Sequence, residues 1–404
     1  MKFNYYIPTK ILFGPGQLSN LHSQKLPGKK ALIVISSGHS VRRYGYLDRL
    51  EKELDLAGAS HALFDRAQPN PVESTVMEGA RFARKEGCDF VIGLGGGSSI
   101  DSAKAIAVMA VNDGDYWDYV SGGTGKGKPV PNDPLPVVAV TTTAGTGTEA
   151  DPWMVTTKED TREKIGFGYE KTFPVLSVVD PELMMSVPAK LTAYQGFDAL
   201  FHSTEGYLNT TAFPISDLYA LKSIELIGKS LPTAVNHGSD KEARSDVALA
   251  NTLAGMVEST SGCISEHAIE HAMSALHPNL PHGAGLIMIS RAYYARIAQK
   301  GACGDSAYKM DGSLSHDTET RIVHYPRQLL EIKCERGLHP TQKPVALFEY
   351  LIRTYTNPGE LVLDSCMGSG TTAVACINTG RNYTGFELDE KYYTTAVKRI
   401  SLKK

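Results

Sequence analysis

Residues 88–111 read CDFVIGLGGGSSIDSAKAIAVMAV, and this stretch decides the expected fold. A short apolar run leads into consecutive glycines, and a segment with helical periodicity follows directly. A strand, turn and helix of this kind is typical of α/β proteins, in which ligands bind at the carboxyl ends of parallel strands. The glycines let the backbone approach a phosphate, and the start of the helix offers free N–H groups. Because the spacing is not GxGxxG, a simple turn explains this stretch equally well.

The same alternation of strand and helix continues on both sides of this stretch. Apolar strands are predicted at residues 3–13, 29–38, 61–67 and 135–143, and amphipathic helices at residues 41–58 and 73–87. From about residue 189 the periodicity is helical throughout. The expected fold is therefore α/β, with a parallel-sheet dinucleotide-binding domain followed by an all-helical domain.

Composition restricts the class of protein. The chain has 404 residues, 42% hydrophobic and 21% charged, with a net charge of −3. This balance is that of a folded globular protein and gives no electrostatic reason to expect nucleic acid as a partner. The six cysteines have no CxxC spacing, and no apolar run is long enough for a membrane span or a signal peptide. We expect a cytoplasmic protein with reduced thiols and no membrane partner; a homo-oligomer is compatible with the sequence.

A second informative stretch is EHAIEHAMSALHPNLPHGAG, residues 266–285. If it is helical, His267 and His271 are four residues apart and share one face, as do Asp198 and His202 in FDALFHSTEG. Imidazole and carboxylate are ligands for Fe, Zn, Mn or Co. Ordinary capping or solvent-facing roles are the alternative, but two such pairs and the imidazole of the PHG turn favour a metal site in the helical domain.

Five segments in order resemble the iron-dependent (group III) alcohol dehydrogenases over residues 1–305. They are PTKILFGPG (8–16), PNPVESTVMEGARFARKEGCDFVIGLGGGSSIDSAKAIA (69–107), TTTAGTGTEA (141–150), VVDPELMMSVPAKLTAYQGFDALFHSTEGY (178–207) and PHGAGLIM (281–288). The resemblance implies hydride transfer between NAD(P)(H) and a small alcohol or aldehyde. It also implies one divalent metal, iron or alternatively zinc, held by four side chains: Asp198, His202, His267 and His282. His271 would be a catalytic residue beside the metal, and His277 is a spare candidate ligand.

The resemblance further implies a set of cofactor-binding residues. They are Ser37, Gly38, Ser40, Gly96, Gly97, Ser98, Asp101, Thr142, Thr143, Thr146 and Lys164. Where NAD-preferring members often carry an acid after the first buried strand, this chain has Ser37, with Arg42 and Arg43 nearby. With no carboxylate at that position to repel a 2′-phosphate, the sequence favours NADP over NAD. The alternative is that both arginines belong to a solvated helix start.

The chain changes character after about residue 305. Residues 304–321 are polar and turn-rich, and the segment that follows resembles the C-terminal part of S-adenosylmethionine-dependent DNA amino-methyltransferases. LVLD (361–364), the glycine turn DSCMGSGTT (364–372) and YTGFE (383–387) imply that S-adenosylmethionine would be bound by Asp364, Gly368, Gly370 and Glu387. Lys343 of HPTQKP would approach its methionine end. No Pro-Pro pair exists to hold a flipped base, so DNA methylation is not expected.

The chain therefore reads as a chimera of three parts. Residues 1–185 form the dinucleotide-binding domain, residues 186–305 a truncated helical metal domain, and residues 306–404 a partial α/β methyltransferase-like segment. The leading hypothesis is a metal-dependent alcohol dehydrogenase or aldehyde reductase. Loss of its last helices would impair the activity if those helices are needed. The alternatives are a DNA amino-methyltransferase fragment and an inactive chimera.

Overall fold

A computed structural model describes residues 2–299, 344–364 and 367–402. The chain divides into two compact units, residues 1–318 and residues 319–404. Lys343 and the polar segment at 304–321 lie outside the described residues. Each unit is described by itself below.

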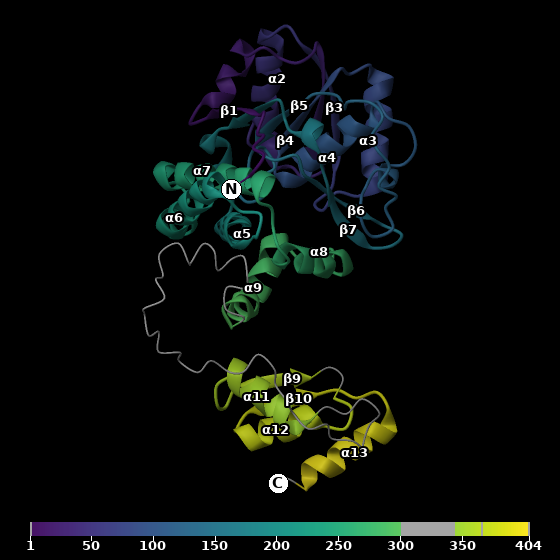
Figure 1. Ribbon diagram of the computed structural model, residues 1–404, viewed down its shortest axis with the longest axis vertical. Coiled ribbons are helices and arrows are strands. Elements are labelled where there is room, and N and C mark those ends of the chain that lie inside the picture. The colour runs from purple at the N-terminus through teal and green to yellow at the C-terminus, as the bar shows by residue number, and fades with distance from the viewer. Residues whose placement is uncertain (1, 300–343, 365–366, 403–404) are drawn as a thin grey trace. The chain divides into compact units, whose positions relative to one another are not determined.

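The first unit is built on a six-stranded parallel sheet with strand order β1-β8-β5-β4-β2-β3 (Figure 1). Its strands are β1 (Lys10–Phe13), β2 (Lys30–Ser36), β3 (Ser60–Ala67), β4 (Phe90–Gly95), β5 (Val137–Thr141) and β8 (Leu176–Val179). Helices α1 (Ser40–Arg43), α2 (Tyr46–Leu56), α3 (Glu73–Glu86) and α4 (Gly97–Met109) connect the first strands, with short 3-10 turns η1 (Gln17–Ser23), η2 (Tyr116–Asp118), η3 (Glu170–Thr172) and η4 (Pro181–Met184). The predicted parallel α/β architecture is confirmed.

Both faces of the sheet are covered by helices. Successive side chains along a strand point to opposite faces, and in these strands the side chains on both faces are apolar. In β2, Leu32 and Val34 pack with α3 and α4, whereas Ile33 and Ile35 pack with η1 and α2 on the opposite face. Of the helices, α4 is buried almost all round. Its first turn is therefore held firmly at the carboxyl edge of the sheet, which is the edge where ligands bind in such folds.

The second half of this unit is helical, as predicted. Its helices are α5 (Ala189–Leu208), α6 (Pro214–Asn236), α7 (Lys241–Thr260), α8 (Glu266–Leu276) and α9 (His282–Gln299). An apolar cluster in α5, α6 and α7 joins these helices to Ala144 and Val179 at the ends of β5 and β8. Gly147 and Gly255 bring the loop after β5 against α7, since a Cβ built on Gly147 would lie 2.5 Å from Gly255 Cα. The helices are therefore packed directly against the carboxyl edge of the sheet.

Three features differ from the expectations. The strand at 3–13 is reduced to β1, and the single helix predicted at 41–58 is split because Gly45 adopts a φ of 70° between α1 and α2. An antiparallel hairpin of β6 (Met154–Lys158) and β7 (Glu163–Phe167) was not predicted. It lies beside α4 and α8 in Figure 1 and carries Lys164 toward the helical part.

The second unit contains a two-stranded parallel sheet and three helices. Its elements are α11 (Val345–Tyr355), β9 (Leu361–Asp364), α12 (Thr371–Thr379), β10 (Asn382–Gly385) and α13 (Glu390–Ser401). The predicted strand, helix and second strand are all present, and of the glycine turn the structure describes residues 364 and 367–372. The pair of strands is solvated, with Leu361 and Leu363 each about two-thirds exposed. None of the helices in the described parts of the chain combines the length and the apolar character needed to cross a membrane.

Candidate metal and dinucleotide site

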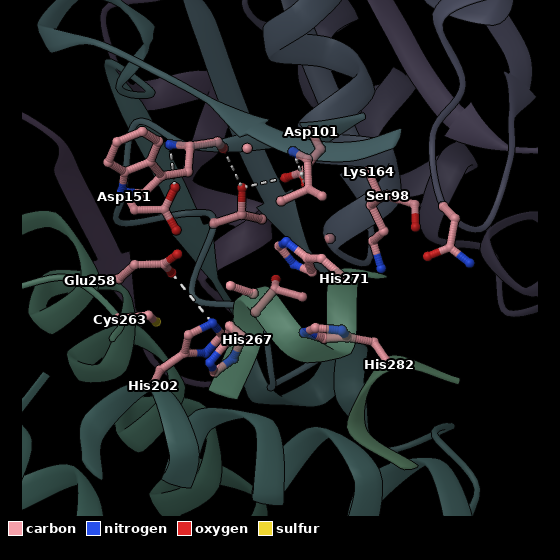
Figure 2. A pocket seen from close by; sticks show the side chains of 18 of the residues that line it. Ser98, Asp101, Asp151, Lys164, His202, Glu258, Cys263, His267, His271 and His282 are labelled. Atoms are coloured by element: carbon pink, nitrogen blue, oxygen red, sulfur yellow. Dashed lines mark hydrogen bonds and ion pairs between the residues drawn. The ribbon is translucent and has the colours of Figure 1, made fainter. Parts of the chain in front are cut away.

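A cavity of about 400 Å³ lies where the carboxyl edge of the sheet meets α5, α7, α8 and the hairpin (Figure 2). Its walls come from segments that are distant in sequence: the start of α4, the loop after β5, β7, helix α7, and the three helices α5, α8 and α9 that carry the histidines. The lining includes Gly97, Ser98, Asp101, Thr146, Lys164, His202, Glu258, Cys263, His267, His271 and His282. The cavity thus brings most of the predicted site residues together.

Asp198, His267 and His282 form the centre of this site. Asp198 Oδ1 lies 3.4 Å from His267 Nε2 and 3.4 Å from His282 Nε2, and the three ligand atoms are all within 4.8 Å of one another. Two ligands that each lie about 2.1 Å from a tetrahedral cation are about 3.4 Å apart. Both separations from Asp198 Oδ1 match this value, so the three atoms can share a single divalent cation.

Two carboxylates orient the imidazoles of this cluster. His267 Nδ1 donates a short hydrogen bond to Glu205 Oε2, and His282 Nδ1 donates one to Glu270 Oε2. Both carboxylates are fully buried. A carboxylate on Nδ1 holds the ring in the tautomer whose Nε2 is free to bind a metal. The outer partners expected of a metal-binding histidine are therefore already in place.

His202 is the fourth predicted ligand, and the structure groups it with His267 and Cys263 and not with Asp198 and His282. It lies one turn after Asp198 on α5, and its Nδ1 is 3.7 Å from Asp198 Oδ1. Its ring stacks on that of His267 with 4.1 Å between centroids, and its Nε2 is 3.5 Å from Glu258 Oε2. His202 Nδ1 is buried and has no hydrogen-bond partner. An orphaned imidazole nitrogen in this position is ready to accept a cation.

The electrostatics of the cluster also fit a cation. Burial opposes ionisation of Asp198, but His282 and His202 outweigh it and hold the pKa of Asp198 far below its usual range. Burial, with the nearby positive charge of His267, lowers the pKa of His202 to about 3, so this ring is neutral. Several buried carboxylates therefore surround the imidazole rings, and not all of these rings carry a positive charge. The cluster is left with excess negative charge, which a divalent cation would balance.

The remaining histidines of the 266–285 stretch have different surroundings. His271 lines the cavity, and its ring centroid lies 5.4 Å from that of His282. Burial lowers its pKa well below the usual range. His277 is exposed at the end of α8 and lines no part of the cavity. His277 is therefore placed away from the cluster, whereas His282 is brought into it.

The predicted glycine turn forms the opposite wall of the cavity. A Cβ built on Gly97 would lie 2.6 Å from Thr146 Cγ2, and one built on Gly96 would lie 3.0 Å from Thr143 Oγ1. The absence of side chains there leaves the N-terminus of α4 open toward the cavity beside Ser98. Backbone N–H groups at such a terminus are suited to a phosphate.

The other predicted cofactor residues are placed less uniformly. Asp101 lines the cavity, but its carboxylate is already bonded, accepting from Thr148 Oγ1 at 2.7 Å and from Val155 N at 3.0 Å. Lys164 Nζ lies 2.9 Å from Ser274 Oγ and 3.7 Å from Glu270 Oε2. Thr142 is buried, and Ser37, Gly38 and Ser40 are exposed beyond the end of β2. The cation Lys164 thus links the sheet side to the histidine side.

Four site residues were not predicted from the sequence: Glu205, Glu258, Glu270 and Cys263. Two of them carried a usable signal, because Glu205 follows His202 by three residues and Glu270 follows His267 by three, each on one helix face. Cys263 lies in the loop between α7 and α8, and Glu258 near the end of α7. Cys263 precedes His267 by four residues, but it lies before the start of α8, so this spacing does not put the two on one helix face; Glu258 has no such spacing.

The second unit has its own smaller site around its glycine turn. Glu387 lines a cavity of about 340 Å³, but its Oε2 accepts the N–H of Gly368 at 2.7 Å and its Oε1 that of Asp389 at 2.9 Å. Asp364 accepts a short hydrogen bond from Thr372 Oγ1. Gly370 has a φ of 78° at the start of α12. The predicted acid at the end of β10 is thus engaged in holding the turn.

Comparison with known families separates the chain in the same way. Residues 8–181 match the iron-containing alcohol dehydrogenase model, and residues 192–318 match the C-terminal model of the Fe-containing alcohol dehydrogenase family. Residues 296–398 match the DNA methylase model. The two-part resemblance seen in the sequence is confirmed.

Individual relatives agree with the first two matches. The NAD-dependent methanol dehydrogenase of Bacillus methanolicus is 37% identical over 309 residues, which are 73% of this chain and 79% of that protein. An archaeal alcohol dehydrogenase from a Red Sea brine pool has a TM-score of 0.72 at 35% identity, covering 74% and 76% of the two chains. The NADH-dependent butanol dehydrogenase A of Thermotoga maritima has a TM-score of 0.69 at 32% identity, covering 74% and 75%.

The fold and the site together define the class as metal-dependent alcohol dehydrogenases built from an α/β sheet and a helical metal domain. The chain belongs to the iron-containing alcohol dehydrogenase family, and it carries in addition a C-terminal segment that matches the DNA methylases.

Proposed function

We propose that this protein transfers a hydride between NAD(H) and a small alcohol or aldehyde, with a divalent cation, iron or alternatively zinc, held by Asp198, His202, His267 and His282. The observation that supports this most directly is the position of Asp198 Oδ1, 3.4 Å from the Nε2 atoms of His267 and His282. When bound, the cation supplies Lewis-acid polarisation of the substrate oxygen, and the nicotinamide supplies the hydride chemistry.

The chain's own residues bind and orient the reactants. Gly96, Gly97 and Ser98 would bind the pyrophosphate at the start of α4, with Thr142, Thr143 and Thr146 on the adjoining strand end. Lys164, directed from β7 toward Ser274 on α8, would approach the nicotinamide half. The cavity has the size of an ordinary small-molecule site. The substrate oxygen would lie on the histidine side, and the cofactor on the sheet side.

His271 is the residue proposed to move the substrate proton. It lines the cavity beside His282, and its ligand atom lies within 4.8 Å of those of Glu270 and His282, but it is not one of the three residues grouped around Asp198. An imidazole in this position can accept the hydroxyl proton as the alcohol is oxidised, and return it when the aldehyde is reduced. Its place in the wall of the cavity is what supports this role.

The choice of dinucleotide depends on the edge of the sheet near Arg42. The sequence favoured NADP because no acid was seen there, but Arg42 Nη2 lies 2.8 Å from Asp65 Oδ2 on the neighbouring strand. That carboxylate neutralises the arginine and would repel a 2′-phosphate. Two relatives are also described as NAD- or NADH-dependent. We therefore propose NAD(H), with NADP(H) as the alternative.

We assign no methyl transfer to the C-terminal segment. S-adenosylmethionine binding by Asp364, Gly368, Gly370 and Glu387 stays a prediction, and Glu387 would have to keep its bonds to the turn while it held a ribose. An upward shift of the thermal transition on adding S-adenosylmethionine to the full chain would support such binding.

The experiment that tests the dehydrogenase proposal combines metal analysis with an assay. The full chain should bind about one divalent cation and oxidise NADH with short aldehydes, and His267→Ala should lose both the metal and the activity. A matched control is His61→Ala, because His61 on β3 is also paired with a carboxylate, Glu51 at 3.3 Å, far from the cavity. Full retention of metal by His267→Ala would contradict the proposed ligand set.

A further inference from the structure

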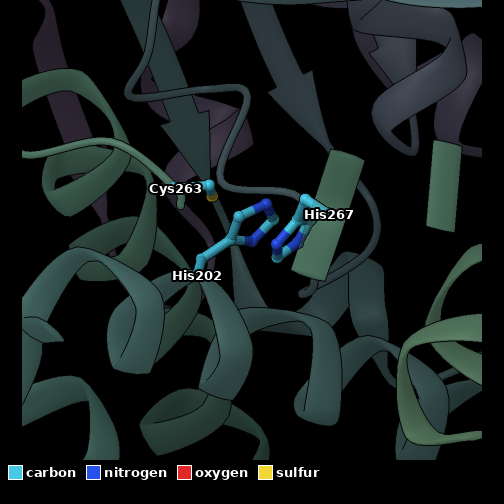
Figure 3. Close-up of side chains that lie close together, drawn as sticks. All are labelled: His202, Cys263 and His267. Atoms are coloured by element: carbon cyan, nitrogen blue, oxygen red, sulfur yellow. The ribbon is translucent and has the colours of Figure 1, made fainter. Parts of the chain in front are cut away.

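A cysteine lies beside the histidines of the cavity. His202, Cys263 and His267 each offer a ligand atom, and these three atoms are within 4.8 Å of one another (Figure 3). Cys263 follows Gly262, whose φ of 73° turns the chain between α7 and α8. The turn places the thiol in the wall of the cavity, next to the stacked rings of His202 and His267. Two nitrogens and a sulfur are thus gathered at one place.

A second observation shows that this place is ready for a ligand. His202 is only 5% exposed, yet its Nδ1 is buried without a hydrogen-bond partner. Burying a polar nitrogen without a partner destabilises the folded protein. In a cavity wall that also contains a thiol, a cation removes this penalty. The thiol of Cys263 is therefore a candidate metal ligand and not only a packing residue of the cavity wall.

We propose that Cys263 is a metal ligand, and that with His202 and His267 it gives the site a sulfur-containing coordination set suited to zinc or cobalt. The proposal rests on the proposed function, because it shares His202 and His267 with the predicted ligands. Thiolate sulfur and imidazole are the ligand types of zinc sites, whereas an all-oxygen and nitrogen set does not discriminate against iron or manganese. Cys263 would therefore shift the metal preference of this chain toward zinc.

When Cys263 binds the metal, its thiol loses one proton. The neutral thiol forms a sulfur–metal bond as its S–H bond breaks, and the proton leaves to solvent through the open cavity. No electron is transferred.

Cobalt spectroscopy of the full chain tests the proposal. Metal-free protein is loaded with Co²⁺, and its visible ligand-field bands and near-ultraviolet sulfur-to-cobalt band are recorded for the parent, for Cys263→Ala and for Cys88→Ala. Cys88 is buried beside β4, away from the cavity, and serves as the matched control. We expect the sulfur band in the parent and in Cys88→Ala, and its complete loss in Cys263→Ala while the ligand-field bands remain.

Failure of the Cys263 proposal and failure of the metal site itself would give different spectra. Ligand-field bands without a sulfur band in the parent would overturn the role of Cys263 and leave the metal-dependent function intact. The absence of both bands would overturn the metal site itself. A second readout is alkylation of the Cys263 peptide by iodoacetamide, measured by mass spectrometry. Zn²⁺ should suppress this labelling, and unchanged labelling at saturating Zn²⁺ would contradict the proposal.

Discussion

The carboxylate of Glu270 accepts a short hydrogen bond from Nδ1 of His282, although twelve residues and a helix break separate them. Glu270 is fully buried, and its pKa stays below the usual range because His282 and Lys164 outweigh the effect of burial. The pair shows how the histidine site is built: α8 supplies the carboxylate that orients the first residue of α9. This relationship leads to the first prediction.

Glu270→Gln should weaken divalent metal binding by about 10- to 100-fold, because the neutral amide no longer fixes the tautomer of His282. Competition with a chelator of known affinity measures the change. Glu51→Gln, which alters the Glu51–His61 pair at the surface, is the control and should leave the affinity unchanged. An unaltered metal affinity in Glu270→Gln would show that His282 is not a ligand.

Gly97→Ala should weaken dinucleotide binding. The new methyl group would lie 2.6 Å from Thr146 Cγ2, so either the turn or the threonine must shift. Overpacking of this kind costs about 1–3 kcal/mol, which corresponds to about 5- to 150-fold in affinity. Titration of NADH fluorescence gives the dissociation constant. Gly228→Ala in α6, where a Cβ meets nothing within 4 Å, should leave NADH binding as it is. Equal affinities for the two variants would refute the assignment of this turn.

Lys104→Met should destabilise the first unit. Lys104 Nζ is fully buried and donates to Thr148 Oγ1, to the carbonyls of Asp151 and Trp153, and to Asp151 Oδ1 at 3.0 Å. Its loss leaves a buried carboxylate without its cation, at a cost of about 3–5 kcal/mol in the free energy of unfolding. Denaturant unfolding measures this value.

The control for Lys104 is Lys222→Met. Lys222 is half exposed and pairs with Glu225 at 2.8 Å on the surface of α6, where an ion pair contributes at most about 1 kcal/mol. A similar loss of stability in both variants would mean that the buried pair is not the cause.

Stability should fall as the pH rises through the window in which Glu149 titrates. Burial raises the pKa of Glu149 from 4.5 to about 7, although a hydrogen bond from Thr252 opposes the shift. Between these two pH values the folded state binds more protons than the unfolded chain, so the free energy of unfolding decreases, by up to about 3 kcal/mol. Thermal unfolding measured from pH 4.5 to pH 7.5 should show this slope, and Glu149→Gln should reduce it, with a remainder from Asp151 and Glu266, whose pKa values burial raises to about 6 and about 7. Glu225→Gln, exposed on α6, should keep it; an undiminished slope in Glu149→Gln would assign it to other groups.

The sequence by itself determined the layers of the first unit and the identity of the ligand candidates. Short, nearly continuous apolar runs between amphipathic segments are typical of a parallel sheet covered on both faces, so β2, β3, β4 and β5 were predicted. Spacing of four residues places two side chains on one helix face, so Asp198 and His202 could be paired without any structure. Local patterns of this kind depend only on backbone geometry.

Only the tertiary structure decided which side chains meet. His282 was an expected ligand and His277 a spare candidate, and the structure leaves His277 exposed at the end of α8 while the start of α9 returns His282 to Asp198 at 3.4 Å. Cys263 is four residues before His267, but it lies in the loop before α8, where helix spacing has no meaning, and Glu258 comes from a neighbouring helix; only the fold brings both to the cavity. Contacts between segments depend on how packed elements cross, and the order of residues along one chain does not record those angles and distances.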